Sequence, residues 1–232
     1  MPRDVARNAP AITHADLMEP VAYRRPFSAE GWLFEVKFDG MRVLIRHRGG
    51  LLELISANGR SLGAQFPEVM ARLGEIPGAW HLDAELVVPD ARGLSDWDRA
   101  RRRSLLRHSV SIAAAACSHP AALIVFDILT HGGEDLRDHS TNERKERLAD
   151  VVVPVPGLQL ARTIETEGEH AFERACSLGT EGVVAKRIDA PYQPGKRPTW
   201  RLIRNPAYRR DSGTSEGIAP TPSRRAEVGA LQ

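Results

Sequence analysis

The chain has 232 residues and a mass of 25.6 kDa, and 42% of its residues are hydrophobic, enough for one large domain or two small ones. No apolar run approaches the length of a membrane span, the N-terminus lacks the apolar segment of a signal peptide, and Cys117 and Cys176 lack metal-ligand spacing. A formal net charge of +2 neither requires nor excludes nucleic acid, because a local basic surface matters more than the sum. We expect a mixed α/β protein of the cytosol with no membrane partner.

The first part of the chain predicts an arm followed by a β-meander. Residues 1–31 are polar and contain proline, which is typical of an arm that packs against a domain. Apolar stretches separated by Asp-Gly and Gly-Gly pairs then predict strands joined by tight turns. These strands are expected at about 32–38, 41–47 and 51–55.

The middle of the chain alternates helix and strand signals. A short helix is predicted over 65–73, because Pro67 suits a first helical turn. The alternating stretch 81–88 predicts a strand. The arginine-rich stretch 94–108 predicts a charged helix; such a run is usually a solvated face, and a role in binding the DNA backbone stays open.

The last third predicts two helices and three strands. Residues 121–129 are nearly all apolar and predict a strand buried on both faces. A helix over 142–151 is expected to expose Glu143, Arg144, Glu146 and Arg147, and a second helix over 167–178 should stop at Gly179. The remaining expected elements are strands at 181–187 and 199–204, and a disordered tail from Asn205 onward.

The strand at 32–38 carries one lysine, Lys37, and one carboxylate, Glu35, in an otherwise apolar run. Strict alternation puts both side chains on the same face of the strand. Loss of hydration favours the neutral amine of a lysine, which is a nucleophile, so Lys37 is a candidate for covalent catalysis. The alternative is a lysine that extends from a strand edge to water.

Residues 37–42, K-F-D-G-M-R, match the K-x-D-G-x-R signature of the covalent nucleotidyltransferases, which include ATP-dependent DNA ligases, RNA ligases and mRNA capping enzymes. The longer phrase GWLFEVKFDGMR most resembles the ligase domain of bacterial end-joining DNA ligases. Further stretches resemble the family's other motifs in the family's order. They are L-D-A-E at 82–85, F-D-I-L at 126–129, E-G-V-V-A-K at 181–186 and W-R-L-I-R at 200–204.

Each of these stretches alone has a structural explanation. Phe126 suits a core position, Asp83 and Glu85 suit the wet face of a half-buried strand, and Glu181 with Lys186 could form a surface pair. Their joint order carries the resemblance.

The resemblance implies a role for each matched residue. Lys37 would attack the α-phosphate of ATP, and its pKa, ordinarily about 10.4, would have to fall for reaction near neutrality. Glu35 would accept from the adenine amino group, favouring ATP over GTP, and Phe126 would stack on the ring. Lys186 would reach the α-phosphate. Further nucleotide contacts are implied for Val36, Arg42, Glu85 and Arg204.

The same resemblance implies a metal site and a fold. Glu85 and Glu181 would hold Mg²⁺ or Mn²⁺, which prefer oxygen ligands. The implied fold is the α+β, ATP-grasp-like nucleotidyltransferase domain, with two antiparallel sheets and helices around an ATP cleft. We assign it residues 32–204, with 1–31 as the arm and 205–232 as the tail. About thirty tail residues are too few for the family's OB-fold domain, so none is expected.

The sequence departs from the family pattern in two motifs. Ala57 stands where an arginine is usual, and Arg60 nearby has a different position. In the last motif Leu202 and Arg204 replace lysines, while Arg201 should point to the opposite face of the strand.

Three functions remain open. The first is an ATP-dependent DNA ligase catalytic domain that forms a lysyl-AMP and seals nicks in double-stranded DNA. Its setting would be the bacterial cytosol and nucleoid, and other end-joining or repair proteins would be its candidate partners. The second is a degenerate ligase that binds ATP or DNA without joining ends, which Ala57 and Leu202 favour. The third, an RNA ligase or capping guanylyltransferase, is opposed by the phrases FEVKFDGMR and FDIL.

Overall fold

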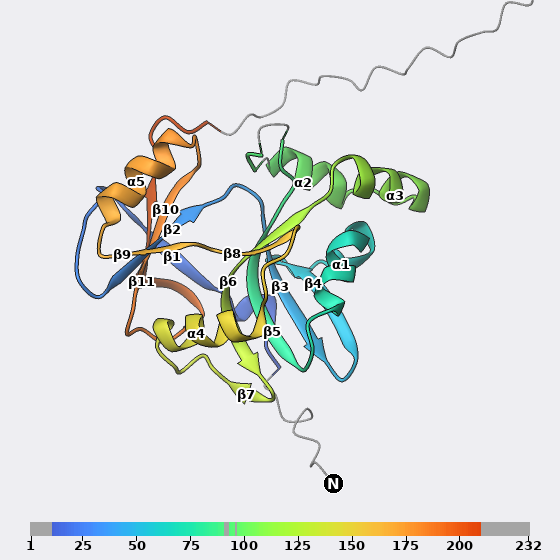
Figure 1. Ribbon diagram of the computed structural model, residues 1–232, viewed down its shortest axis with the longest axis horizontal. Helices are drawn as coiled ribbons and strands as arrows, with labels where there is room; N and C mark the ends of the chain where they lie inside the picture. Colours follow the sequence, from blue (N-terminus) through green and yellow to red (C-terminus); the bar gives the residue numbers. More distant parts are fainter. Residues whose placement is uncertain (1–10, 91–92, 96, 210–232) are drawn as a thin grey trace, which may run out of the picture.

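Two twisted β-sheets lie side by side in the computed structural model, with helices on their outer surfaces (Figure 1). The structure describes residues 11–90, 93–95 and 97–209, so the predicted disordered tail lies outside the described residues from 210 onward. Its expected start at Asn205 is wrong, because Asn205 is buried and its side chain donates a hydrogen bond to the carbonyl of Thr180. No helix in these ranges combines the length and the apolar character that a membrane crossing needs.

The larger sheet, sheet I, has the strand order β4-β3-β5-β6-β7, and β8 pairs with β6. The pairs along the main order are antiparallel, whereas β8 runs parallel to β6. Gly49 and Gly50 turn the β3–β4 hairpin with positive φ values of 57° and 80°, as predicted for a Gly-Gly turn. The strands are β3 (Met41–Arg48), β4 (Leu51–Ser56), β5 (Trp80–Val87), β6 (Ala122–His131), β7 (Glu134–Asp135) and β8 (Leu158–Leu160).

The second sheet, sheet II, has the order β1-β11-β10-β2-β9. Only β1 and β11 are parallel within it. The two-residue alternation of β2 holds: Phe34 packs in an apolar cluster under a helix, and Glu35 and Lys37 face sheet I. The strands are β1 (Met18–Tyr23), β2 (Trp32–Lys37), β9 (Thr163–Glu165), β10 (Gly182–Arg187) and β11 (Gly195–Arg204).

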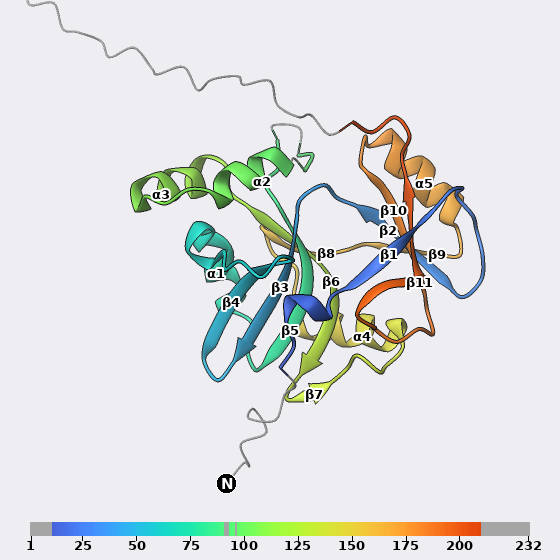
Figure 2. The ribbon, with the colours of Figure 1, turned by 180° about the vertical axis from the view of Figure 1, so that it is seen from behind.

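The helices lie around the two sheets, as the two opposite views show (Figures 1 and 2). Helix α5 packs on β2 and β10, and α1, α2 and α3 lie on the side of sheet I. A reciprocal capping box between Ser140 and Glu143 starts α4. The helices are α1 (Pro67–Gly74), α2 (Trp97–Ser104), α3 (Ser109–Ser118), α4 (Thr141–Val151) and α5 (Gly168–Ser177), with 3₁₀ turns at His14–Asp16 and Gly63–Gln65.

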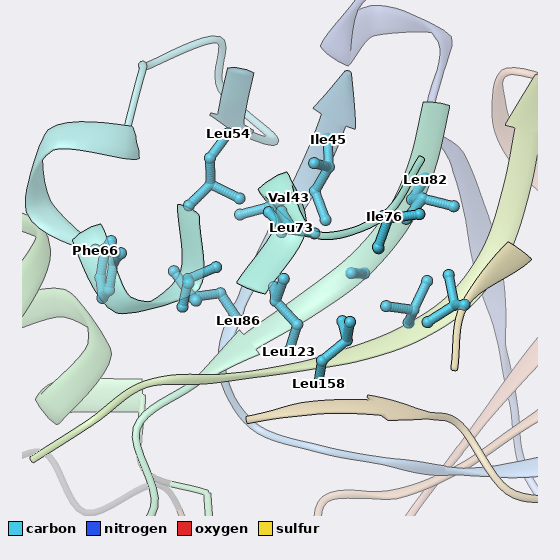
Figure 3. Close-up of a cluster of buried hydrophobic side chains, with 14 of the residues drawn as sticks. Val43, Ile45, Leu54, Phe66, Leu73, Ile76, Leu82, Leu86, Leu123 and Leu158 are labelled. Atoms are coloured by element: carbon cyan, nitrogen blue, oxygen red, sulfur yellow. The ribbon is translucent and has the colours of Figure 1, made fainter. Parts of the chain in front are cut away.

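The main core lies between sheet I and α1. Figure 3 shows side chains from β3, β4, β5, β6 and α1 pointing toward one another, among them Val43, Leu73 and Leu123. Burial of each such side chain is worth about 1.5–3 kcal/mol, which makes sheet I a rigid support for residues on its other face. A second cluster, including Leu44, Leu129 and Trp200, joins the two sheets.

Several expectations need correction. The stretch assigned to an arm contains β1, whose pairing with β11 makes it part of sheet II. The expected helix over 94–108 is wrong in extent: α2 ends at Ser104, because the amides of Leu105 and Leu106 turn back to carbonyls three residues earlier. Helix α3 follows and was not predicted.

The arginines of the two charged helices are not all solvated. On α4, Glu143 and Glu146 are exposed, but Arg144 is fully buried and pairs with Asp127. On α2, Arg103 is buried and binds Glu68. In both cases a carboxylate from another element compensates the buried charge, which local periodicity cannot reveal.

The expectation that residues 121–129 are buried on both faces is wrong for the first half of β6. Leu123 and Val125 are buried, but Ile124 and Phe126 are partly exposed. The reason is that Ile124 and Phe126 line a cavity, which leaves their face of β6 partly open.

Candidate active site

A cavity of about 220 Å³ opens between the sheets, with β2 and β10 on one side and β5 and β6 on the other. This volume is below the about 300–1,000 Å³ typical of whole ligand pockets, so it suits one ring system of a larger ligand. Apolar walls are provided by Ile124, Val184 and Trp200. The predicted nucleotide contacts that line it are Glu35, Val36, Lys37, Arg42, Glu85, Phe126 and Lys186.

Lys37 lies at the end of β2, beside two carboxylates from different strands. Its Nζ is 3.4 Å from Oε2 of Glu181 and 3.9 Å from Oε2 of Glu85, and it donates a hydrogen bond to the carbonyl of Phe38. The backbone register explains the first contact, because Lys37 is paired with Gly182, the residue after Glu181. The lysine side chain is 25% exposed, so a ligand can reach its amine.

The two carboxylates at Lys37 fit a hard divalent cation. Glu85 and Glu181 both direct an oxygen toward the same Nζ, so they converge on one point. Among the described residues no group of three metal-binding side chains occurs, so a cation here would take its other ligands from water or phosphate, as Mg²⁺ commonly does. Burial raises the pKa of Glu85, against the lowering effect of Lys37 and Arg42.

The turn after Lys37 is fixed by close packing. A Cβ on Gly40 would lie 2.5 Å from the carbonyl oxygen of Leu86, so only glycine fits. Asp39 is buried, its amide donates to Ser95, and one of its carboxylate oxygens accepts from the hydroxyl of Tyr208. These contacts hold the lysine-bearing turn against β5.

Arg42 is held by Asp83 in a two-point ion pair. The Nε and Nη2 atoms of Arg42 lie 3.0 and 2.7 Å from the two carboxylate oxygens. Burial opposes the charge, but Asp83 outweighs it and raises the pKa of Arg42. Tyr192 donates its hydroxyl to Asp83 at 2.6 Å, and burial raises the pKa of Tyr192 well above its ordinary value. The guanidinium therefore stays charged over the ring of Phe126, 5.5 Å from its centroid.

Lys186 lines the same cavity from β10. It is paired with Leu33, four residues before Lys37 on β2, which corresponds to about 13 Å along the strand. Its Nζ is 2.7 Å from Oε2 of Glu35 and lies over the rings of Phe126 and Trp200. The structure thus brings Lys186 to Glu35, and its role at the α-phosphate stays a prediction.

Burial lowers the pKa of Lys186 to about 8, although Glu35 acts in the opposite direction. The charged groups around its Nζ are Glu35, Lys145 and Asp127. Between about pH 8 and the ordinary 10.5, the unfolded chain therefore binds a proton that the folded chain has released.

We expect the free energy of unfolding to rise with pH across that interval, with a slope of up to about 1.4 kcal/mol per pH unit from this group. Urea unfolding at a series of pH values from 7 to 10 measures it. In Lys186→Met this contribution to the slope should vanish; an unchanged slope in the variant would show that another group titrates.

Three arginines discussed in the sequence analysis lie outside the cavity lining. Arg204 is exposed and pairs with Glu181, so it stands at the Lys37 end, outside the cavity lining. Arg60 does not replace the arginine missing at Ala57, because its side chain donates to the carbonyl of Ser104. Arg201 points away from the cavity and lies over the ring of Trp32, as alternation predicts.

Sequence reasoning missed three residues that organise the site. Asp83 was interpreted as part of a wet face, and neither Tyr192 nor Lys145 was considered. Tyr192 belongs to a Pro/Gly-rich loop, and Lys145 belongs to a charged helix, so local pattern gave no sign that either reaches the site. The composition held one signal for Lys145: only four of the 32 Lys and Arg residues of the chain are lysines.

Fold and site together define a nucleotidyltransferase-type domain, and comparisons with known proteins specify it further. A family model described as ATP dependent DNA ligase domain matches residues 17–203. The chain therefore belongs to the family of ATP-dependent DNA ligase domains.

Individual relatives agree with this membership. DNA ligase C1 of Mycolicibacterium smegmatis is 37% identical over 181 residues, which are 74% of this chain and 51% of that protein. The multifunctional non-homologous end joining protein LigD of Pseudomonas aeruginosa is 29% identical over 86% of this chain and 23% of its own length. The chain thus spans about half, or less, of these relatives. A mycobacterial DNA ligase D solved with ATP and MES superimposes with a TM-score of 0.66 at 26% identity, covering 82% of this chain and 60% of that one.

Proposed function

We propose that this chain is the catalytic domain of an ATP-dependent DNA ligase. The amine of Lys37 attacks the α-phosphorus of ATP, a phosphorus–nitrogen bond forms, and pyrophosphate leaves with the electrons of the broken phosphoanhydride bond. The amine proton passes to solvent. The AMP is then transferred to the 5′-phosphate at a DNA nick, which frees Lys37, and attack by the 3′-hydroxyl closes the nick with release of AMP.

The observation that carries the proposal is the position of Lys37 between Glu85 and Glu181, at one end of a cavity sized for a ring system. In the proposed complex Phe126 stacks on adenine, Glu35 accepts from its amino group, and Val36 forms part of the wall. Arg42 and Arg204 neutralise phosphate charge. The residues fit Mg²⁺ or Mn²⁺ through Glu85 and Glu181, and the cation would supply charge neutralisation to the phosphates.

The substrate we propose is nicked double-stranded DNA in the bacterial cytosol and nucleoid. Two of the relatives named above are bacterial ligases or end-joining proteins, which supports this setting and makes other end-joining or repair proteins the candidate partners.

The test is the intact mass of the protein after incubation with ATP and either Mg²⁺ or Mn²⁺, followed by a nick-sealing assay. A mass increase of one AMP, with GTP inactive, and a sealed product support the proposal. ATP binding without a mass increase under either metal supports the second candidate, a degenerate ligase domain. Leu202 favours that candidate, since it replaces a cation with an apolar side chain.

Leu202 allows a direct prediction. It is 8% exposed and is paired with Val184, which lines the cavity, so a side chain at this position lies on the cavity face of sheet II. We expect Leu202→Lys to raise the rate of lysine adenylation about tenfold, the effect of roughly one charge-assisted contact. Leu202→Met is the matched uncharged control. An equal or lower rate in the lysine variant would mean that the site has been rebuilt around leucine.

A further inference from the structure

Helix α4 sends one side chain to the buried carboxylate at the base of the cavity. Glu35 is 4% exposed, and each of its two carboxylate oxygens forms an ion pair with a different lysine. Lys186 from β10 contacts Oε2 at 2.7 Å, and Lys145 from α4 forms an ion pair with Oε1. Lys186 is part of the cavity wall, whereas Lys145 is not.

Lysine is rare in this chain compared with arginine. The chain has four lysines, Lys37, Lys145, Lys186 and Lys196, and the other 28 of its 32 Lys and Arg residues are arginines. Three of the four therefore gather along one face of β2. The neighbouring Arg144 serves a separate buried pair with Asp127, so adjacent α4 side chains compensate different carboxylates.

A carboxylate that has only one partner can turn about its terminal torsion, which is broad and roughly two-fold. Glu35 Oε1 forms an ion pair with Lys145 and Oε2 forms one with Lys186 at the cavity wall, and the two opposed attractions favour one orientation of the Glu35 carboxylate. An ionised carboxylate only accepts hydrogen bonds, so in this orientation it attracts an N–H donor and repels a carbonyl oxygen.

We propose that Lys145 is a positioning residue that fixes Glu35 so that the site selects a purine with a 6-amino group over purines that lack it. The inference rests on the proposed function, because it assigns the base of the nucleotide to this end of the cavity. Lys145 acts through Glu35 and does not touch the nucleotide itself. Its removal leaves Glu35 with Lys186 alone, free to turn toward that lysine and away from the base.

The experiment compares equilibrium binding of ATP and of purine riboside 5′-triphosphate, which lacks the 6-amino group, by calorimetry without turnover. For the wild-type chain we expect ATP to bind about ten- to a hundredfold more tightly, the effect of one hydrogen bond to a charged acceptor. In Lys145→Met this ratio should fall toward one, mainly through loss of ATP affinity. Lys145→Arg should retain part of the ratio, because the charge remains.

Arg147→Met is the matched control. It removes one positive charge from the same helix, but Arg147 pairs with Glu134 and does not contact Glu35, so the ratio should stay at the wild-type value. A merely structural role of Lys145 predicts an equal loss of affinity for both nucleotides, and that result overturns the proposal. If Lys145→Met fails to fold, Lys145→Arg decides. Arginine has a longer, forked side chain, so it should disturb the geometry that lysine fixes. Wild-type affinities for both nucleotides in Lys145→Arg would therefore also overturn the proposal.

Failure of the proposed function has a different signature. A wild-type chain that binds neither nucleotide removes the basis for both ideas. A wild-type chain that discriminates between the nucleotides, and keeps doing so without Lys145, overturns only the assignment of Lys145.

Discussion

Lys37→Ala is expected to abolish the covalent AMP adduct completely. The amine of Lys37 is the group that lies between Glu85 and Glu181, and no other lysine is placed there. Intact-mass measurement after incubation with ATP and metal gives a direct answer. Lys37→Arg should also form no adduct, because a guanidinium keeps its proton and is a poor nucleophile, yet it retains the positive charge at the site.

The matched control for this experiment is Lys196→Ala. Lys196 is exposed on β11, so its removal should leave the adduct at the wild-type level. An adduct that persists in Lys37→Ala would show that the nucleophile is misassigned. Peptide mapping would then need to distinguish only Lys145, Lys186 and Lys196.

Arg144→Met is expected to lower the free energy of unfolding by about 3–5 kcal/mol, which is typical when one partner of a buried ion pair is removed. The Nε and Nη2 atoms of Arg144 bind both oxygens of Asp127 at 2.8 and 3.1 Å, and Nη1 donates to the carbonyls of His139 and Ala190. All of these acceptors lose the hydrogen bonds that Arg144 donates in the wild type. Because Asp127 follows Phe126 directly, the loss should also loosen the cavity wall.

The stability deficit of Arg144→Met should depend on pH in a definite direction. Burial alone would raise the pKa of Asp127, but Arg144 outweighs it, so the pKa lies below the ordinary 3.8. In the wild type the pair therefore contributes stability at neutral pH that is lost only as the pH falls through this lowered value. Without Arg144 the buried carboxylate is uncompensated, its pKa rises, and the variant's deficit should shrink as the pH is lowered from 7 toward 5.

Urea unfolding at pH 7 and pH 5 measures both effects. Arg147→Met on the same helix should change stability by less than about 1 kcal/mol, since its ion pair is partly exposed. The double variant Asp127→Leu with Arg144→Met should recover part of the loss, because apolar groups of similar size can replace a buried pair. A deficit of Arg144→Met that is small, or that grows at low pH, would contradict the assigned role.

Much of the site was predictable from the sequence because its chemistry is carried by short motifs. Lys37 and Glu35 lie two residues apart on one strand, so the two-residue period alone places them on the same face, and the structure agrees. The stop of α5 at Gly179 and the opposite direction of Arg201 followed from equally local rules. The predicted hairpin at Asp39-Gly40 is wrong, because β2 and β3 belong to different sheets and do not pair with each other.

The errors concern residues whose surroundings come from distant parts of the chain. Arg144 was assigned to solvent because its helix is highly charged, and only the packing of α4 on β6 shows that Asp127 receives it. Phe126 and Ile124 read as a continuous apolar strand, and only the second sheet shows that a cavity covers them. The early strand β1 was missed because its partner, β11, lies near the other end of the described chain.

The amino-acid sequence by itself determined the family motifs and the strand faces on which the candidate groups lie, since dihedral periodicity and turn chemistry act over a few residues. Only the tertiary structure decided which charges meet. It placed Lys186 beside Glu35, added Lys145 from a helix, and tied Arg42 to Asp83 and Tyr192. The physical reason is that a buried charge is stable only beside its partner, and the partner's position is set by the packing of whole sheets and helices.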